Sequence, residues 1–273
     1  MNLKKKIALA LLAGIISGSV GYASPAVIER EAISQVALLQ SLAQGYFGGT
    51  VTVKDLRAMG DTGIGTFEGL NGEMIVLDGT VYQALGDGRV VVADDKVIVP
   101  YATVTVFDND ISLDLKNIAD KAAFEKALNK MVKQCGENSF YMVKLHTEFS
   151  SVLFRSEYGS KPPYPTLLEA LKGKQTEFTA KNIKGTLVGL YCPSYMGELN
   201  TPGWHFHFIS DDKKQGGHIL ELSLKQGTVN FDKTDKFTMI LPNDKNFHKL
   251  NLKKDMSADI KSAEQDKQAN MRK

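Results

Sequence analysis

Apolar and polar residues alternate in short runs along most of this 273-residue chain, and the runs are rich in β-branched side chains. Glycine and aspartate interrupt the runs at pairs such as Asp78-Gly79 and Asp87-Gly88, which favour tight turns. Short β-branched runs separated by turns are typical of a meander of strands. We predict strands within residues 50–53, 73–77, 80–82, 90–92, 97–107, 140–146, 148–154, 185–191, 203–210, 218–224 and 237–241.

A few segments follow a helical period instead. Apolar residues within 111–134 fall near one face while lysine and glutamate occupy the other, which predicts a helix. Residues 33–42 have a similar amphipathic spacing. Thr166 is predicted to cap a short helix over 166–171, and the charged residues 253–273 to form a solvated terminal helix.

These elements indicate an α/β (α+β) fold of two domains, with mixed β-sheets in each half and few helices. The content of 43% hydrophobic and 23% charged residues is that of a globular chain with a sizeable core. A boundary after the proline-rich segment 162–165 would divide the chain into a β-rich α/β domain over 24–170 and a β-rich domain over 171–273. The second domain would carry a histidine-rich hairpin and the terminal helix.

The first 23 residues have the pattern of a cleaved secretory signal peptide. Three lysines at 4–6 precede an apolar stretch that ends in the small residues around Ala23. A membrane anchor is the alternative, but the stretch is shorter than the about 18–20 apolar residues that cross a bilayer. We therefore expect an exported protein, periplasmic or secreted, with no membrane attachment after cleavage.

The charge balance bears on the class of partner. The chain has 33 basic and 31 acidic residues, and without the three leader lysines the balance is 30 to 31. A near-neutral chain lacks the positive charge by which proteins neutralise phosphates, so we expect no nucleic-acid partner. Export leads to an oxidising compartment, where Cys135 and Cys192 either form one disulfide or remain two isolated buried thiols.

Three of the five histidines fall in one predicted hairpin. His205 and His207 are two residues apart on a strand and so share a face, and His218 returns beside them after a polar turn. Three imidazoles around one point match a catalytic zinc site with an open coordination position. Neutral nitrogen ligands favour Zn²⁺ over Mg²⁺ or Ca²⁺, and Ni, Co and Fe are alternatives that suit the same ligands. Ordinary hydrogen-bonded strand histidines are the alternative, and that interpretation applies to His146 and His248.

An open metal site works with a carboxyl group for proton transfer and with a cation for an anionic substrate. Thr66 and Glu73 flank a glycine-rich turn that could present both at a rim, although a solvated glutamate in an ordinary turn is the alternative. Arg155 stands alone in a long stretch that otherwise uses lysine, and its planar guanidinium suits a carboxylate. Glu264 in the charged terminal segment is a further carboxyl candidate.

Taken together, these residues resemble the acetolactate decarboxylase family, bacterial enzymes that convert 2-acetolactate to acetoin and carbon dioxide. The resemblance extends over essentially the whole chain after the leader, in the family's order. Its segments are Gly63-Ile64-Gly65-Thr66-Phe67, Leu70, Gly72-Glu73, Leu77-Asp78-Gly79, Arg155 with Pro163-Tyr164, Gly203 with His205-Phe206-His207-Phe208, Gly216-Gly217-His218, and Glu264.

The resemblance implies a two-domain α/β fold and a zinc ion bound by His205, His207 and His218. It also implies that Glu73 and Glu264 line the site and that Arg155 and Thr66 contact 2-acetolactate. The metal would stabilise the enediolate that remains after loss of carbon dioxide. Arg155 would hold the departing carboxylate, and one of the two glutamates would deliver a proton.

Two other functions fit the histidines alone. One is an exported zinc hydrolase, in which metal-bound water attacks an ester or amide. The other is a metal-binding module without enzymatic activity. Convergence of the carboxylates and Arg155 on the imidazoles would favour the decarboxylase, whereas scattered groups would favour the module. The oligomeric state is open, with a homodimer as one option.

Overall fold

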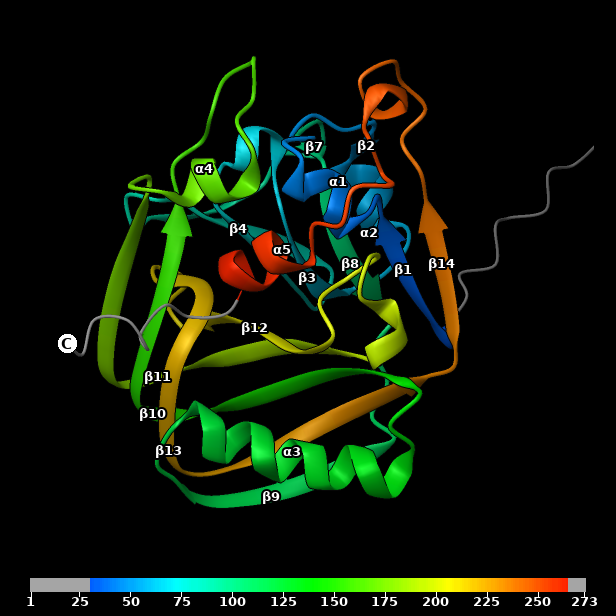
Figure 1. Cartoon of the computed structure of the whole chain (residues 1–273). Helices are drawn as coiled ribbons and strands as arrows, with labels where there is room; N and C mark the ends of the chain where they lie inside the picture. The colour runs from blue at the N-terminus through cyan, green and yellow to red at the C-terminus, as the bar shows by residue number, and fades with distance from the viewer. Residues whose placement is uncertain (1–29, 265–273) are drawn as a thin grey trace, which may run out of the picture.

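Two large β-sheets lie one above the other and carry most of the strands (Figure 1). The computed structural model describes residues 30–264, so the predicted signal peptide at residues 1–23 lies outside the described residues. The first sheet has the order β14-β1-β8-β3-β4-β5-β6. Its strands are β1 (Ala32–Val36), β3 (Thr62–Thr66), β4 (Glu73–Leu77), β5 (Thr80–Ala84), β6 (Val90–Val92), β8 (Tyr101–Thr105) and β14 (Lys236–Ile240).

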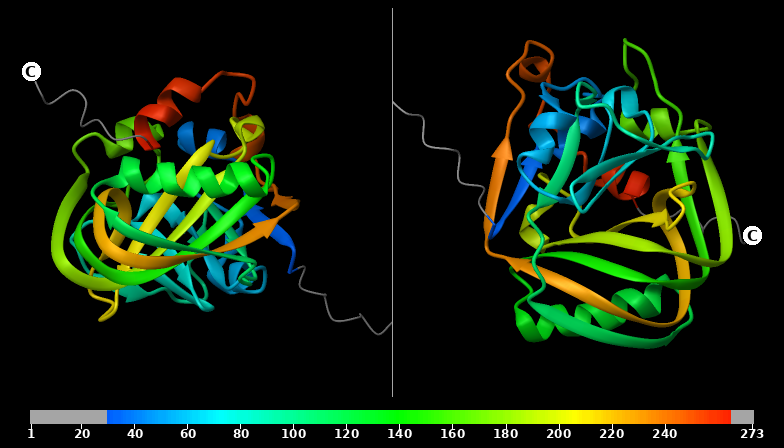
Figure 2. Two further views of the ribbon diagram at one scale, coloured as in Figure 1. Left: turned by 90° about the horizontal axis from the view of Figure 1, so that it is seen from below. Right: turned by 180° about the vertical axis from the view of Figure 1, so that it is seen from behind.

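The second sheet is built from longer strands in the order β10-β11-β12-β13-β9. Its strands are β9 (Ile111–Ile118), β10 (Phe140–Glu157), β11 (Gln175–Cys192), β12 (Gly203–Ser210) and β13 (Gly216–Thr234). Because β10 also pairs with β13, this sheet curls back on itself (Figure 2). A small third sheet pairs β2 (Val51–Thr52) with β7 (Ile98–Val99).

The helices are few and lie around the sheets. They are α1 (Leu39–Ala43), α2 (Val53–Arg57), α3 (Lys121–Cys135), α4 (Leu167–Leu171) and α5 (Ser257–Glu264), with short 3-10 turns at Glu68–Leu70, Ser194–Met196 and Phe247–Lys249. α3 covers the second sheet, and α1, α4 and α5 pack together beside the first (Figure 1). No helix among residues 30–264 is long and apolar enough to cross a membrane. The predicted α+β class is confirmed.

Sheet membership does not follow the predicted boundary at residue 170. β9 and β10 precede that residue yet pair with the C-terminal strands of the second sheet. β14 follows it yet returns to the first sheet, where it runs parallel to β1. The division into units 24–170 and 171–273 stays a prediction, and each large sheet combines strands from both sides of that boundary.

The helix predicted over 111–134 is correct only in its second part, because the first part is strand β9. Asp120 starts α3 by accepting a hydrogen bond from the Ala123 N–H at 2.7 Å, a typical N-cap. One face of α3 then buries Phe124 and Val132. The residues of β9 are fixed instead by their ladder with β13, a long-range pairing that helical spacing alone does not reveal.

Residues 33–42 are another correction, since they form β1 and then α1 rather than one amphipathic helix. β1 pairs with β8 on one edge and with β14 on the other, and both of its faces carry buried side chains such as Ile33 and Val36. The short helix after Thr166 is confirmed, and Thr166 and Glu169 form a capping box. Cys135 and Cys192 are both free thiols, so the disulfide alternative is not realised.

A buried carboxyl group links the two sheets. Thr105 at the end of β8 donates its hydroxyl to Asp232 Oδ2 on β13 at 3.1 Å, and Asp232 is fully buried. Burial raises the pKa of Asp232 to about 7, and repulsion from Asp108 and Asp110 acts in the same direction. Near neutral pH this carboxyl group therefore carries a proton for much of the time.

We expect Asp232 to make the folded state less stable as the pH rises from about 4 to above 7. The unfolded chain releases this proton near pH 3.8 but the folded protein retains it up to about pH 7. The folded state thus binds more protons between these values, and stability falls across them by on the order of a few kcal/mol. Urea denaturation between pH 4 and 8 measures this, and Asp232→Asn should remove that part of the slope. Identical pH dependence in both proteins would contradict the assignment.

Candidate metal centre and active-site cavity

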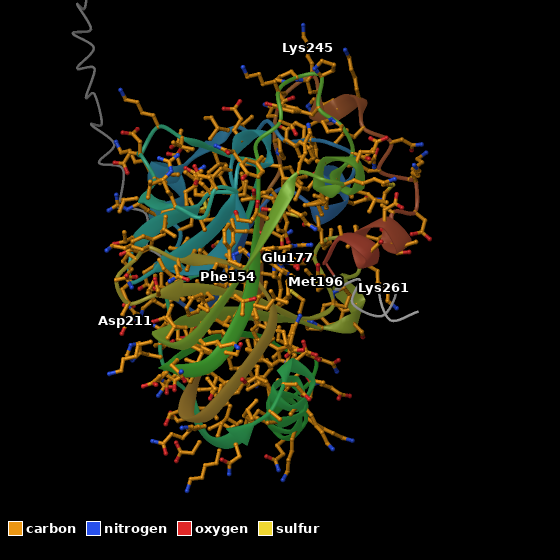
Figure 3. The ribbon with its side chains drawn as sticks, turned by 90° about the vertical axis from the view of Figure 1, so that its left-hand side faces the viewer. Phe154, Glu177, Met196, Asp211, Lys245 and Lys261 are labelled. Atoms are coloured by element: carbon orange, nitrogen blue, oxygen red, sulfur yellow. The ribbon has the colours of Figure 1, made fainter. Side chains whose placement is uncertain are left out.

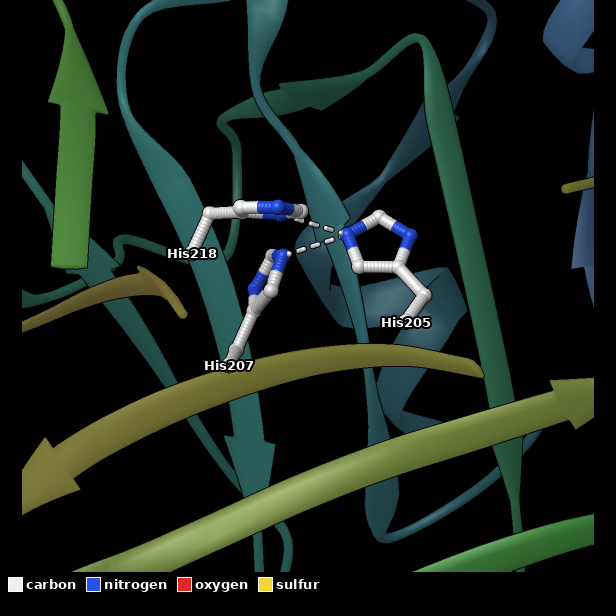
Figure 4. Close-up of side chains that lie close together, drawn as sticks. All are labelled: His205, His207 and His218. Carbon is white, nitrogen blue, oxygen red and sulfur yellow. Dashed lines mark hydrogen bonds between the residues drawn. The ribbon is translucent and has the colours of Figure 1, made fainter. Parts of the chain in front are cut away.

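Three histidine rings meet on the side of the second sheet that faces the first sheet (Figure 4). His205 and His207 project from the same face of β12, and His218 stands opposite His207 on β13. His205 Nε2 lies 3.0 Å from His207 Nε2 and 2.9 Å from His218 Nδ1. The structure thus brings together the three predicted ligands, because the hairpin has the register that the spacing required.

The hydrogen bonds around these rings indicate where their lone pairs point. His207 Nδ1 lies 2.8 Å from the Met74 carbonyl, so this nitrogen carries the proton and donates it. In the neutral ring, His207 Nε2 then presents a lone pair to His205 Nε2. His205 Nε2 also faces His218 Nδ1. One proton on His205 Nε2 can form a good hydrogen bond to His207 or to His218, but not to both. A cation between the rings would satisfy all three nitrogens.

The electrostatic environment keeps the rings neutral. Burial is the main cause that lowers the pKa of His205 to about 3 and the pKa values of His207 and His218 well below the ordinary value. The Arg155 guanidinium lowers all three further. Neutral imidazole is the form that binds a metal. Tetrahedral zinc with Zn–N bonds of about 2.0–2.1 Å separates its nitrogen ligands by about 3.3 Å, close to the spacing found here. The residues present therefore fit a metal ion.

Strand β4 of the first sheet supplies the next layer of the site. Glu73 Oε2 lies 3.4 Å from His207 Nε2, and the carbonyl of the following residue, Met74, orients that same ring. Glu73 pairs across the ladder with Thr66 on β3, and Thr66 donates its hydroxyl to the Gly72 carbonyl at 2.9 Å. Both side chains are buried, so the alternative of a solvated glutamate in an ordinary turn is wrong.

The glycine-rich segment lets β3 approach β8 closely at this point. A Cβ atom on Gly65 would lie 2.5 Å from the Tyr101 carbonyl oxygen, well inside van der Waals contact. A larger residue would push β3 away from β8 and displace Thr66, the next residue along. Glycine is therefore required here by the close approach of the backbones.

Arg155 closes the cavity from strand β10. Its Nη2 donates to the carbonyl of Ala263 on α5 at 2.7 Å, and its Nε lies 3.7 Å from Glu157 Oε1. Only 9% of the residue is exposed. The cavity is lined by Thr66, Glu73, Arg155, Glu157, His205 and His218, together with leucines of α1 and α4. Side chains of opposite charge thus line one cavity together with two of the three metal-binding imidazoles.

Comparison with known proteins identifies the family. The family model for alpha-acetolactate decarboxylase matches residues 33–254. The chain belongs to the alpha-acetolactate decarboxylase family. An alpha-acetolactate decarboxylase from Methanosarcina mazei is 37% identical over 86% of this chain and 80% of its own length. One from Brevibacillus brevis is 35% identical over 87% and 82%. The predicted family and the carboxy-lyase class of enzyme are confirmed.

The fold is shared as well. The crystal structure of alpha-acetolactate decarboxylase from Bacillus subtilis strain 168 superposes with a TM-score of 0.82 at 30% identity, covering 86% of this chain and 100% of that one. Alpha-acetolactate decarboxylase family membership therefore rests on sequence and on structure.

In this member of the alpha-acetolactate decarboxylase family, the structure brings most of the predicted site residues together. Thr66, Glu73, Arg155, His205 and His218 line the cavity, and His207 lies behind this lining in contact with His205 and Glu73. The exception is Glu264, which ends α5 and whose side chain lies outside the described part of the structure. Sequence reasoning missed Glu157, although its position two residues after Arg155 on a strand places it on the same face.

Proposed function

We propose that this chain is a zinc-dependent acetolactate decarboxylase that converts 2-acetolactate to acetoin and carbon dioxide. One observation carries the proposal: a cluster of three metal-binding imidazoles stands at a cavity that a buried carboxylate and a buried guanidinium also line. The relatives named above support the choice of reaction. A metal-binding module without enzymatic activity would not require Arg155 and Glu73 beside the metal-binding histidines.

His205, His207 and His218 would hold the metal. Three neutral nitrogen ligands suit Zn²⁺ better than Mg²⁺ or Ca²⁺, which prefer oxygen. When bound, the metal supplies Lewis-acid stabilisation of negative charge on the oxygens of the substrate's hydroxyketone. The Met74 carbonyl fixes the ring of His207 in the orientation and tautomer that this role requires.

Arg155 is suited to bind the substrate carboxylate before it leaves. Its guanidinium is buried, and its Nε has no hydrogen-bond partner among the described residues. A substrate carboxylate can therefore accept a charge-assisted hydrogen bond from Arg155 Nε at a position where little water competes for it. Breaking the bond between the carboxylate and the adjacent carbon releases carbon dioxide and leaves the electron pair as an enediolate.

The enediolate needs a proton on carbon to become acetoin. Glu73 is the described carboxyl group beside the histidines, at 3.4 Å from His207, and we assign the delivery of this proton to it or to Glu264. Thr66 donates its own hydroxyl hydrogen to Gly72, so its oxygen can accept a hydrogen bond from a substrate hydroxyl. Leu39 and Leu171 on the cavity wall exclude water from the reacting carbon.

The same chain is proposed to act outside the cytoplasm, because residues 1–23 have the pattern of a signal peptide. The mature protein would then begin near residue 24 and carry the complete set of site residues.

A chelation experiment tests the proposed function. The purified mature chain loaded with Zn²⁺ is expected to form acetoin from 2-acetolactate. Dialysis against a chelator should abolish acetoin formation, Zn²⁺ should restore it, and Mg²⁺ should not. If the zinc-loaded protein forms no acetoin, the reaction is wrong; if the metal-free protein retains full activity, the metal dependence is wrong.

A further inference from the structure

Glu157 is a buried acid in the active-site cavity to which the proposed reaction gives no role. It follows Arg155 by two residues on β10, so the two side chains share a face, and it is 3% exposed. It lines the same cavity as Thr66, Glu73 and Arg155. A carboxylate is costly to bury without a compensating charge, and the guanidinium of Arg155 supplies a positive charge beside it.

Arg155 is held at two points. The Ala263 carbonyl of α5 accepts a hydrogen bond from Nη2 at 2.7 Å, and Glu157 Oε1 lies 3.7 Å from Nε. The second contact is an ion pair, because 3.7 Å is too long for a hydrogen bond between nitrogen and oxygen. Glu157 therefore attracts the guanidinium without using up the Nε–H as a donor.

We propose that Glu157 is a positioning residue for Arg155. Its charge keeps the guanidinium beside the metal-binding imidazoles, where the Nε–H remains available to a substrate carboxylate. The proposal rests on the proposed function in one respect only, namely that Arg155 binds a carboxylate. Without Glu157 the guanidinium has the Ala263 carbonyl as its one described anchor, and its long side chain gains alternative rotamers.

Two unreactive ligands test whether Glu157 positions Arg155 without requiring decarboxylation. 2-Hydroxyisobutyrate has a carboxylate and a tertiary hydroxyl, whereas 3-hydroxy-3-methyl-2-butanone has the hydroxyketone but no carboxylate. Calorimetry on the zinc-loaded enzyme measures both affinities. In Glu157→Gln we expect about tenfold weaker binding of the hydroxy acid, or about 1.4 kcal/mol. Binding of the hydroxyketone and the zinc content should be unchanged.

Further variants sharpen the test. Glu157→Asp keeps the negative charge and should recover part of the lost affinity. Glu177→Gln is the matched control, because Glu177 stands opposite Arg155 on β11 but is exposed (Figure 3). It removes the same charge in solvent and should leave hydroxy-acid binding unchanged. With 2-acetolactate, Glu157→Gln should raise KM more than it lowers kcat.

Three outcomes would overturn the proposal. Tighter binding of the hydroxy acid to Glu157→Gln would show that Glu157 opposes the anion instead of presenting the guanidinium. Equal weakening of both probes would indicate a general change of cavity shape. Unchanged binding of both would show that Arg155 does not need Glu157. Binding of the two probes does not depend on catalysis. If the wild type forms no acetoin, the proposed function is wrong, but the binding of the probes to wild type and Glu157→Gln still tests the role of Glu157.

Discussion

Replacing His205 by alanine is expected to abolish zinc binding and acetoin formation together. His205 Nε2 lies between His207 and His218, so its loss removes the central of the three nitrogens. Lewis-acid stabilisation contributes several kcal/mol, and its loss corresponds to roughly 10³-fold or more in rate. Metal analysis of the purified protein and an acetoin assay measure the two effects.

His146→Ala provides the control for that experiment. His146 is 64% exposed in its side chain and pairs with Asp211 at 3.0 Å on the surface, away from the cavity. Its replacement should leave zinc content and rate unchanged. A His205→Ala protein that lacks zinc yet keeps full activity would end the metal-based mechanism. One that keeps zinc in full would remove His205 from the ligand set.

The second large effect is expected from Arg155→Lys, which should lower kcat/KM by on the order of 10²-fold while zinc content stays unchanged. Lysine keeps the charge but replaces a planar fork by a point charge. It cannot hold the Ala263 carbonyl and a substrate carboxylate in the same plane, as the guanidinium can. Steady-state kinetics with 2-acetolactate and metal analysis measure the result.

Arg57→Lys is the matched control, since Arg57 is an exposed arginine that pairs with Asp95 at 3.0 Å. Exposed ion pairs contribute little, so neither stability nor turnover should change appreciably. Loss of zinc in Arg155→Lys would place the arginine in the metal site rather than at the substrate. Unchanged kinetics would remove it from substrate binding.

The histidine site could be predicted because its geometry is local. His205 and His207 share a face by the two-residue period of a strand, and one hairpin turn returns His218 to the neighbouring strand. β4, β6 and β12 could be placed for the same reason, since their β-branched or aromatic runs end at turn residues. Strand periodicity and turn residues are enough to place side chains that are close together in the sequence.

The remaining parts of the site depend on contacts between distant segments. The Met74 carbonyl that orients His207 is 133 residues away, and the Ala263 carbonyl that holds Arg155 is 108 residues away. No local pattern marks a backbone carbonyl as a partner. Residues 33–36 have helical spacing but form part of β1 for a similar reason, because pairing with β8 and β14 outweighs that spacing.

The α+β class, the family and the residue types that can bind a metal and an anion can all be inferred from the sequence. The folded chain is needed to show that Glu73 lies against His207, that Glu157 lines the cavity beside Arg155, and which sheet each strand joins. The physical reason is that strand pairing and side-chain burial are long-range. Their free energy depends on neighbours that the folded chain brings together and that no short window of residues contains.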